Sequence, residues 1–178
     1  MRKPYLILII LVLISCQEKD WKTNLLNEIA EYETSEKIDK EYSLKHNSGN
    51  DILIELFKTH SNGLTKLTAK YERPELGNWE KLFYLKNGKV LYSRNFGIAP
   101  VRNLENDTFN RPKYFLVERK VWFENDSIGK EEIKELEMSD LKSIESKKAE
   151  LLKMEFITSD LNISDYKLFE SDFKALTE

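Results

Sequence analysis

The side chains that most often carry catalysis or bind metal ions are few in this sequence. His46 and His60 are its two histidines, and neither stands in the HExxH spacing that places two ligands on one helix face. His60 lies beside an expected turn, where a solvated side chain is a simpler interpretation than a ligand. The six glycines are isolated, so no glycine-rich loop is available to cradle a phosphate. The sequence therefore predicts no catalytic residue, no metal site and no cofactor.

Carboxylates are the remaining candidates for chemistry. The pair Glu131-Glu132 alternates with Lys130 and Lys134, a pattern typical of the solvated edge of a strand. A paired-carboxylate hydrolase needs two acids that the fold brings together, and sequence spacing does not exclude one. A non-enzymatic protein is the main hypothesis, and a small cell-envelope hydrolase with an acidic site is the alternative.

Cys16 is the only cysteine, and the segment before it is built like an export signal. Arg2 and Lys3 supply positive charge, residues 5–14 are an unbroken apolar run, and the chain turns small and polar at Ser15. These three parts are typical of a signal peptide. A transmembrane anchor is the weaker alternative, because the run is much shorter than the roughly 20 residues that span a bilayer.

The four residues Leu13-Ile14-Ser15-Cys16 resemble the lipobox of bacterial lipoproteins, which has an aliphatic residue three positions before the cysteine and a small residue directly before it. The resemblance implies that residues 1–15 are cleaved and that Cys16 becomes the lipid-bearing first residue. Two or more acyl chains, as that family carries, anchor a protein stably. Lipidation at Cys16 also leaves no thiol for redox chemistry.

The charge balance argues against a nucleic-acid partner. Two of the 28 basic residues leave with the signal, which changes the formal net charge from −3 to −5. Nucleic-acid binding needs clustered Lys and Arg instead. After a short tether at 16–20, the length and composition of residues 21–178 suit a single globular domain.

The middle of the chain predicts a meandering antiparallel sheet. Three times an apolar run meets an Asn-containing turn, at 61–63, 87–88 and 125–126, and a second apolar run follows. Asn-Gly favours hairpins because both central residues of a type I′ turn need positive φ. The expected fold is α+β with about six strands, at 52–60, 64–71, 79–85, 89–96, 114–123 and 127–136. Residues 35–46 fit a helix or a strand, and 52–60 also fits a helix capped by Asp51.

Helical stripes flank the expected sheet at both ends. The N-terminal stripe consists of Trp21, Leu25, Ile29 and Tyr32, with Asp20 as the N-cap. Near the C-terminus, Ser139 or Asp140 suits the cap of one helix and Ser164 the cap of a last short helix. The first of these carries Leu141, Ile144, Leu151 and Leu152, and the second carries Tyr166, Phe169 and Phe173. Such stripes predict packing against the core.

Alternation gives the strand at 114–123 two unlike faces. One face is apolar except for Arg119, and the other is half polar, with Tyr114, Glu118 and Trp122 among its residues. If the half-polar face is exposed, Tyr114 and Trp122 are candidate ligand contacts beside the loop at 97–112, because exposed aromatic side chains carry much of the energy of an interface. The alternative is that the helix beginning near Ser139 covers this face and makes both rings ordinary core.

The hairpins at 84–90 and 122–128 share one order of residue types: aromatic, apolar, charged, Asn, turn residue, polar, aliphatic. With Asn110-Arg111-Pro112 between them and the lipobox in front, they look like a group of small uncharacterised lipoproteins of bacteroidete bacteria. The likeness spans 64–128 and departs at Asp126, where the group usually has Gly. It implies no catalytic residue.

The residues after Cys16 resemble the charged tag that sends lipoproteins of those bacteria to the cell surface: Glu18, Lys19 and Asp20. Together with Gln17, where enteric bacteria use Asp for inner-membrane retention, they favour the outer membrane over the inner membrane. Whether the domain faces the periplasm or the surface stays open. The expected partners are the membrane, through the lipid, and an envelope protein, a peptide or a glycan.

Overall fold

The computed structural model describes residues 21–34, 38–45, 51–58, 63–72, 77–101 and 113–177. Cys16, His46 and His60 lie outside these residues. The contacts within the chain divide it into two compact units, Met1–Ser35 and Glu36–Glu178, which are described separately. In the described parts, no helix is both long and apolar enough to cross a membrane.

The described part of the first unit is one helix, α2 (Trp21–Glu33). Its buried side chains are Leu25, Ile29 and Tyr32, which confirms the predicted N-terminal stripe. The expected N-cap, Asp20, lies outside the described residues.

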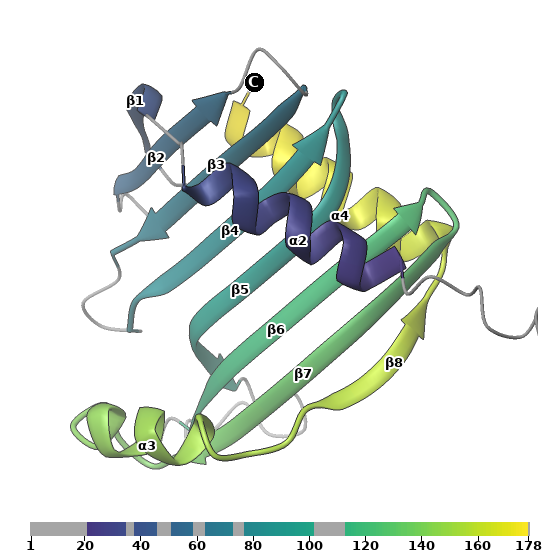
Figure 1. The fold of residues 1–178 in the computed structure, drawn as a ribbon. Helices are drawn as coiled ribbons and strands as arrows, with labels where there is room; N and C mark the ends of the chain where they lie inside the picture. The colour runs from purple at the N-terminus through teal and green to yellow at the C-terminus, as the bar shows by residue number, and fades with distance from the viewer. Residues whose placement is uncertain are drawn as a thin grey trace, which may run out of the picture. The chain divides into compact units, whose positions relative to one another are not determined.

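The second unit is built on one antiparallel sheet of eight strands that lie in chain order (Figure 1). The strands are β1 (Ile38–Lys45), β2 (Asp51–Lys58), β3 (Leu64–Tyr71), β4 (Trp79–Lys86), β5 (Lys89–Val101), β6 (Lys113–Asn125), β7 (Ile128–Met138) and β8 (Ile157–Leu161). Helix α3 (Ile144–Leu151) connects β7 to β8, and α4 (Ile163–Thr177) follows β8. An α+β fold with an antiparallel meander is confirmed, but the predicted count of six strands is wrong.

The two strands that the sequence did not predict lie at the edges of the sheet. β1 falls where helix and strand patterns overlap, and its pairing with β2 turns Tyr42 and Leu44 toward the core. β8 is short and almost wholly exposed, so it carries no apolar alternation, and its pairing with β7 defines it. The segment at 52–60 fitted both a helix and a strand, and its residues 52–58 belong to strand β2.

The hairpin turns follow from local backbone preferences. At the second turn, Asn87 has φ 52° and Gly88 has φ 79°, the two positive values that a type I′ turn needs. At the first turn, Gly63 has φ 69°, while residues 61 and 62 lie outside the described part. The third turn consists of Asp126 and Ser127, one residue later than predicted.

One face of the sheet, which we call the α4 face, packs against helix α4. Val121 and Phe123 of β6 belong to an apolar cluster that reaches from β2 to α4. The Phe123 ring meets Tyr166 and Phe169 of α4 edge to face, with centroids 5.0 and 5.6 Å apart. α4 therefore crosses behind the sheet in the view of Figure 1.

The other face, which we call the α3 face, carries a separate apolar cluster at one end of the strands. There Leu151 of α3 packs with Ile98, Tyr114, Leu116 and Met138. α3 begins at Ile144, after a turn in which Asp140 Oδ1 accepts hydrogen bonds from the following backbone N–H groups.

The cap of α4 is Asn162 rather than the expected Ser164. Asn162 Oδ1 accepts a hydrogen bond from the Ser164 N–H at 2.7 Å, and Asp165 Oδ2 accepts one from the Asn162 N–H at 2.9 Å. This reciprocal pair is a capping box, and it fixes Asp165 in the first turn of the helix.

Candidate functional site

The two predicted contact residues are buried. Tyr114 is 9% exposed and packs in the cluster that contains Leu151 of α3, which is the covered arrangement given as the alternative above. Trp122 is 3% exposed, and its ring lies 5.4 Å from that of Tyr92. Neither ring has the solvent exposure on which its candidacy depended. Of the expected loop at 97–112, residues 97–101 belong to β5 and the others lie outside the described residues.

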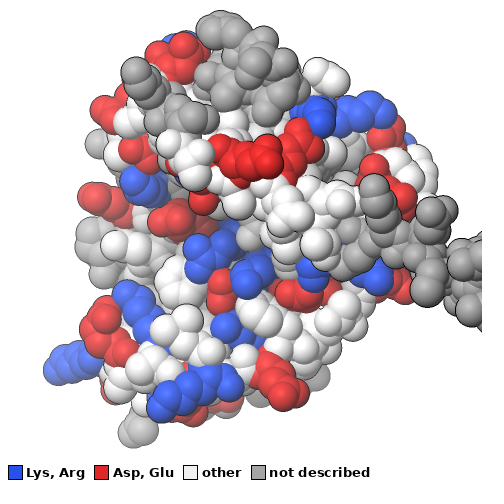
Figure 2. All heavy atoms as spheres, in the orientation of Figure 1, with Lys and Arg blue, Asp and Glu red and all other residues white. Residues whose placement is uncertain are grey.

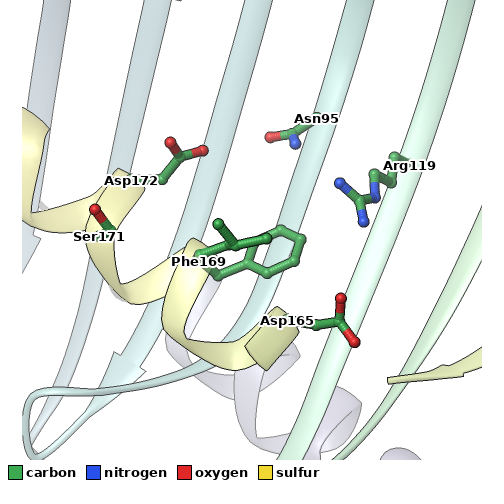
Figure 3. A pocket seen from close by; sticks show the side chains of 7 residues that line it. Asn95, Arg119, Asp165, Phe169, Ser171 and Asp172 are labelled. Atoms are coloured by element: carbon green, nitrogen blue, oxygen red, sulfur yellow. The ribbon is translucent and has the colours of Figure 1, made fainter. Parts of the chain in front are cut away.

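A pocket lies on the α4 face at the point where Arg119 interrupts the apolar row of β6 (Figure 3). Asn95 and Arg119 are direct partners in the β5–β6 register and form one wall. α4 supplies the other wall with Asp165, Leu168, Phe169, Ser171 and Asp172. The cavity measures about 170 Å³. We call it the α4 pocket.

Arg119 is held on one edge and free on the other. Its Nε donates a hydrogen bond to Glu131, whose second oxygen accepts one from Ser159 Oγ at 3.0 Å. Its guanidinium carbon lies 5.0 Å from the centroid of the Phe169 ring, a cation–π contact. The terminal nitrogens of Arg119 make no hydrogen bond to any described residue. The orientation is therefore fixed while donors stay available.

Asn95 places an unpaired acceptor in the same pocket. Its side chain is 8% exposed, and its Oδ1 has no hydrogen-bond partner within the described part of the chain. Ser93, two residues earlier on the same face, has a buried Oγ that likewise lacks a described partner. An unsatisfied buried polar group costs about 1–3 kcal/mol, so its presence calls for an explanation. A ligand donor in the pocket would satisfy the Asn95 oxygen.

The carboxylates of α4 that line the pocket already have partners. Asp172 Oδ2 accepts a hydrogen bond from Lys81 Nζ at 2.6 Å. Asp165 takes part in the capping box, in the first turn, where the helix dipole favours negative charge. With Glu131 opposite Arg119 and Lys81 opposite Asp172, two of the three lining charges have an oppositely charged partner, and Asp165 has the N-terminal end of the helix dipole instead.

A second polar cluster lies on the α3 face. Its residues Arg94 and Glu118 directly precede Asn95 and Arg119 on β5 and β6. Glu118 of β6 accepts hydrogen bonds from Arg94 Nε at 2.9 Å and from Lys134 Nζ at 3.1 Å, and Lys120 Nζ lies 3.8 Å away. The Phe156 ring lies 4.3 and 4.4 Å from the two lysine nitrogens. Figure 2 shows basic and acidic side chains interleaved on this side of the molecule. We call these groups the Glu118 cluster.

Opposing effects set the pKa of Glu118. Burial raises the pKa of this carboxyl, but the hydrogen bond from Lys134 and the charges of Arg94 and Lys120 lower it by more. The pKa of Glu118 therefore lies below the ordinary value of 4.5. The ionised carboxylate is thus the stable form at neutral pH. Because three cations surround the Glu118 carboxylate, we interpret the Glu118 cluster as a group that stabilises the fold.

Metal binding finds no support in the described part of the chain, where no three His, Cys, Asp or Glu side chains gather around a common point. Comparisons of the chain with protein-family models, curated proteins and solved structures found no match. Among the described residues, the α4 pocket is therefore the feature whose chemistry bears on function.

Proposed function

We propose that this protein is a lipid-anchored lipoprotein of the cell envelope that binds a partner in the α4 pocket without catalysing a reaction. The observation that supports binding is the buried Asn95 Oδ1, which has no hydrogen-bond partner among the described residues and lies beside Arg119 donors that are also free of these residues. The support for anchoring is separate and comes from the lipobox-like residues that end at Cys16.

The anchoring is tested by substituting Cys16→Ser. We expect this change to abolish labelling by a radioactive or clickable fatty acid and to leave an unprocessed precursor in the inner membrane. Normal labelling and sorting of the variant would show that the lipoprotein assignment is wrong.

The binding is tested on the full-length lipidated protein by ligand-observed NMR with small polar compounds. We expect at least one compound to bind, and Asn95→Val to weaken its binding. Binding that is insensitive to Asn95→Val would place the interaction outside the pocket and contradict the proposal.

A hydrolase is the second candidate, because two carboxylates of α4, Asp165 and Asp172, line the same pocket. We favour binding because each carboxylate is already engaged, one by the capping box and the other by Lys81. Turnover of a bound compound that is lost in Asp165→Asn or Asp172→Asn would establish the hydrolase instead.

A further inference from the structure

Within the described residues, the α4 pocket combines donors and an acceptor that have no hydrogen-bond partner. The terminal nitrogens of Arg119 donate only, and Asn95 Oδ1 accepts only. A ligand that satisfies both must accept from Arg119 and donate to Asn95. A hydroxyl group does both, whereas a carboxylate only accepts and an ammonium only donates.

The charges around the pocket argue for an uncharged ligand. Arg119 is opposed by Glu131, and Asp172 is opposed by Lys81. Asp165 has no ion pair with a described side chain, but it lies in the first turn of α4, where the helix dipole offsets part of its charge. An anion that entered would lose its hydration without meeting an unpaired cation, and a cation would meet only Asp165. A neutral ligand that carries several hydroxyl groups does not pay this desolvation cost.

We infer that the α4 pocket binds a sugar residue through adjacent hydroxyl groups, an assignment that depends on the proposed binding function of the same pocket. One hydroxyl donates to Asn95 Oδ1, its neighbour accepts from Arg119, and a third donates to the carboxylate of Asp172. The cavity of about 170 Å³ is smaller than the roughly 300–1,000 Å³ of sites that enclose a drug-sized ligand. It therefore admits one sugar ring, and the rest of a glycan stays in solvent.

The experiment is saturation-transfer NMR on the full-length lipidated protein, in a detergent without a sugar headgroup. The probes are neutral hexoses, deoxyhexoses, pentoses and N-acetylhexosamines, with acetate, methylammonium and glycine as charged probes. We expect a neutral sugar to bind with a millimolar Kd, and Asn95→Val and Arg119→Gln each to weaken it about tenfold. Lys120→Gln is the matched control, because it removes a charge from the next position of β6 on the opposite face and should leave binding unchanged.

Each outcome separates the sugar assignment from the binding function. A charged probe that binds in an Asn95-dependent way, without any sugar, overturns the sugar assignment and leaves the binding function standing. Absence of binding by every probe, or binding that both pocket variants leave unchanged, overturns both. If Arg119→Gln fails to fold, Arg119→Lys keeps the charge opposite Glu131 but loses the forked donors, and it should weaken sugar binding as well.

Discussion

Two neighbouring pairs of residues on β5 and β6 differ in whether their buried polar groups have hydrogen-bond or ion-pair partners. Arg94 and Glu118 point to the α3 face, where the carboxylate meets three cations. Asn95 and Arg119, one position further along each strand, point to the α4 face. There the Asn95 acceptor and the terminal Arg119 donors have no hydrogen-bond partner in the part of the chain that the structure describes. Burial is similar for Glu118 and Asn95, at 4% and 8% exposure. Pairing, rather than burial, separates the structural cluster from the candidate binding site.

The largest expected effect comes from breaking the paired cluster. Glu118→Gln removes the charge that Lys134 needs while Lys134 remains 5% exposed. Loss of one partner of a buried ion pair typically costs about 3–5 kcal/mol, and we expect the free energy of unfolding to fall by about 3 kcal/mol in urea denaturation. The control is Glu124→Gln, an exposed acid on the same strand, which should change it by less than about 0.5 kcal/mol. Equal effects of the two changes would contradict the contrast.

The same cluster predicts a pH dependence. The pKa of Glu118 is lower in the folded state than its ordinary value of 4.5, so the folded state binds fewer protons there than the unfolded state. The resulting stability is complete above the ordinary pKa and is lost as the pH falls below it through the lowered pKa. We expect urea melts at stepped acidic pH to show a steeper loss of stability in the wild type than in Glu118→Gln. The pKa of Glu55 is also lowered, mainly by its hydrogen bond from Lys70, so the difference between the two proteins is the informative quantity.

For Asn95 in the α4 pocket, we expect a substitution to have an effect of the opposite sign. Asn95→Val removes an unsatisfied buried acceptor and places a β-branched side chain in a strand, and we expect stability to rise by about 1 kcal/mol in the absence of ligand. Thermal unfolding measures the gain. Because the same change should weaken binding, Asn95 would show that stability has been exchanged for function. A destabilised Asn95→Val would mean that the amide has a structural role.

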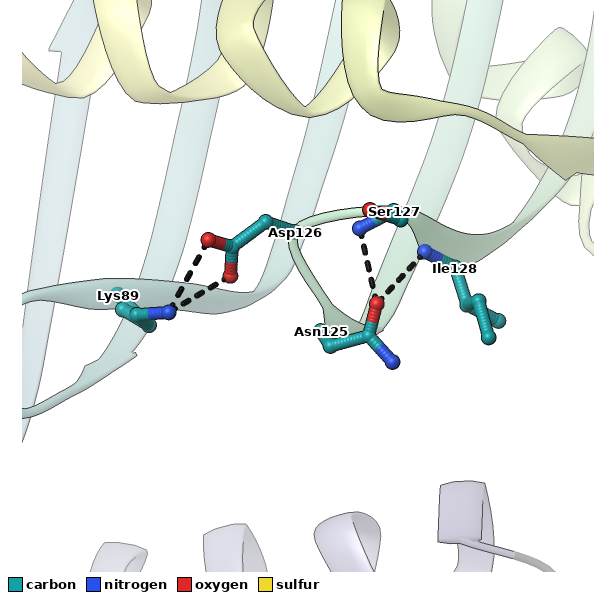
Figure 4. A network of polar contacts seen from close by, with 5 residues as sticks. All are labelled: Lys89, Asn125, Asp126, Ser127 and Ile128. Carbon is teal, nitrogen blue, oxygen red and sulfur yellow. Dashed lines mark hydrogen bonds and ion pairs between the residues drawn. The ribbon is translucent and has the colours of Figure 1, made fainter.

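The smallest effect is expected at an exposed ion pair that joins the second and third hairpin turns (Figure 4). Lys89 Nζ contacts both carboxylate oxygens of Asp126 at 2.8 and 3.1 Å, and this contact raises the pKa of Lys89 and lowers that of Asp126. Solvent screens the pair, so Asp126→Asn should leave the melting temperature unchanged within error. The neighbouring Asn125 Oδ1 accepts the Ser127 and Ile128 N–H groups, and Asn125→Ala should cost about 1 kcal/mol.

Much of the sheet follows from local sequence signals. Strand alternation separates Arg119 from Glu118, and the Asn87-Gly88 turn has the backbone that Asn-Gly favours. The edge strand β8 is not visible in the sequence, because an exposed strand needs no apolar pattern. The sequence predicts the cap of α4 two residues late, since Ser164 and Asn162 are both good capping residues and only the reciprocal bond with Asp165 distinguishes them.

The candidate site was only half visible. Arg119 stands out as a charged residue in an apolar row, but Asn95 looks like any polar residue on a half-exposed strand. The connection from β5 to β6 is long, so their register, which makes Asn95 and Arg119 partners, does not follow from a tight turn. The burial of Tyr114 likewise arises from packing against Leu151 of α3, a segment that is distant in sequence.

The contact between β1 and the C-terminal end of α4 has a consequence for the order of folding. Every strand pairs only with its neighbours in the chain, and such local contacts form quickly. The hydrogen bond from Tyr42 Oη to the Leu176 carbonyl, at 2.7 Å, instead joins residues 134 positions apart. The hairpins can therefore form from neighbouring segments, whereas α4 has to close a long loop before it docks on the sheet. Since α4 supplies one wall of the pocket, we expect the sheet to form before the binding site is complete.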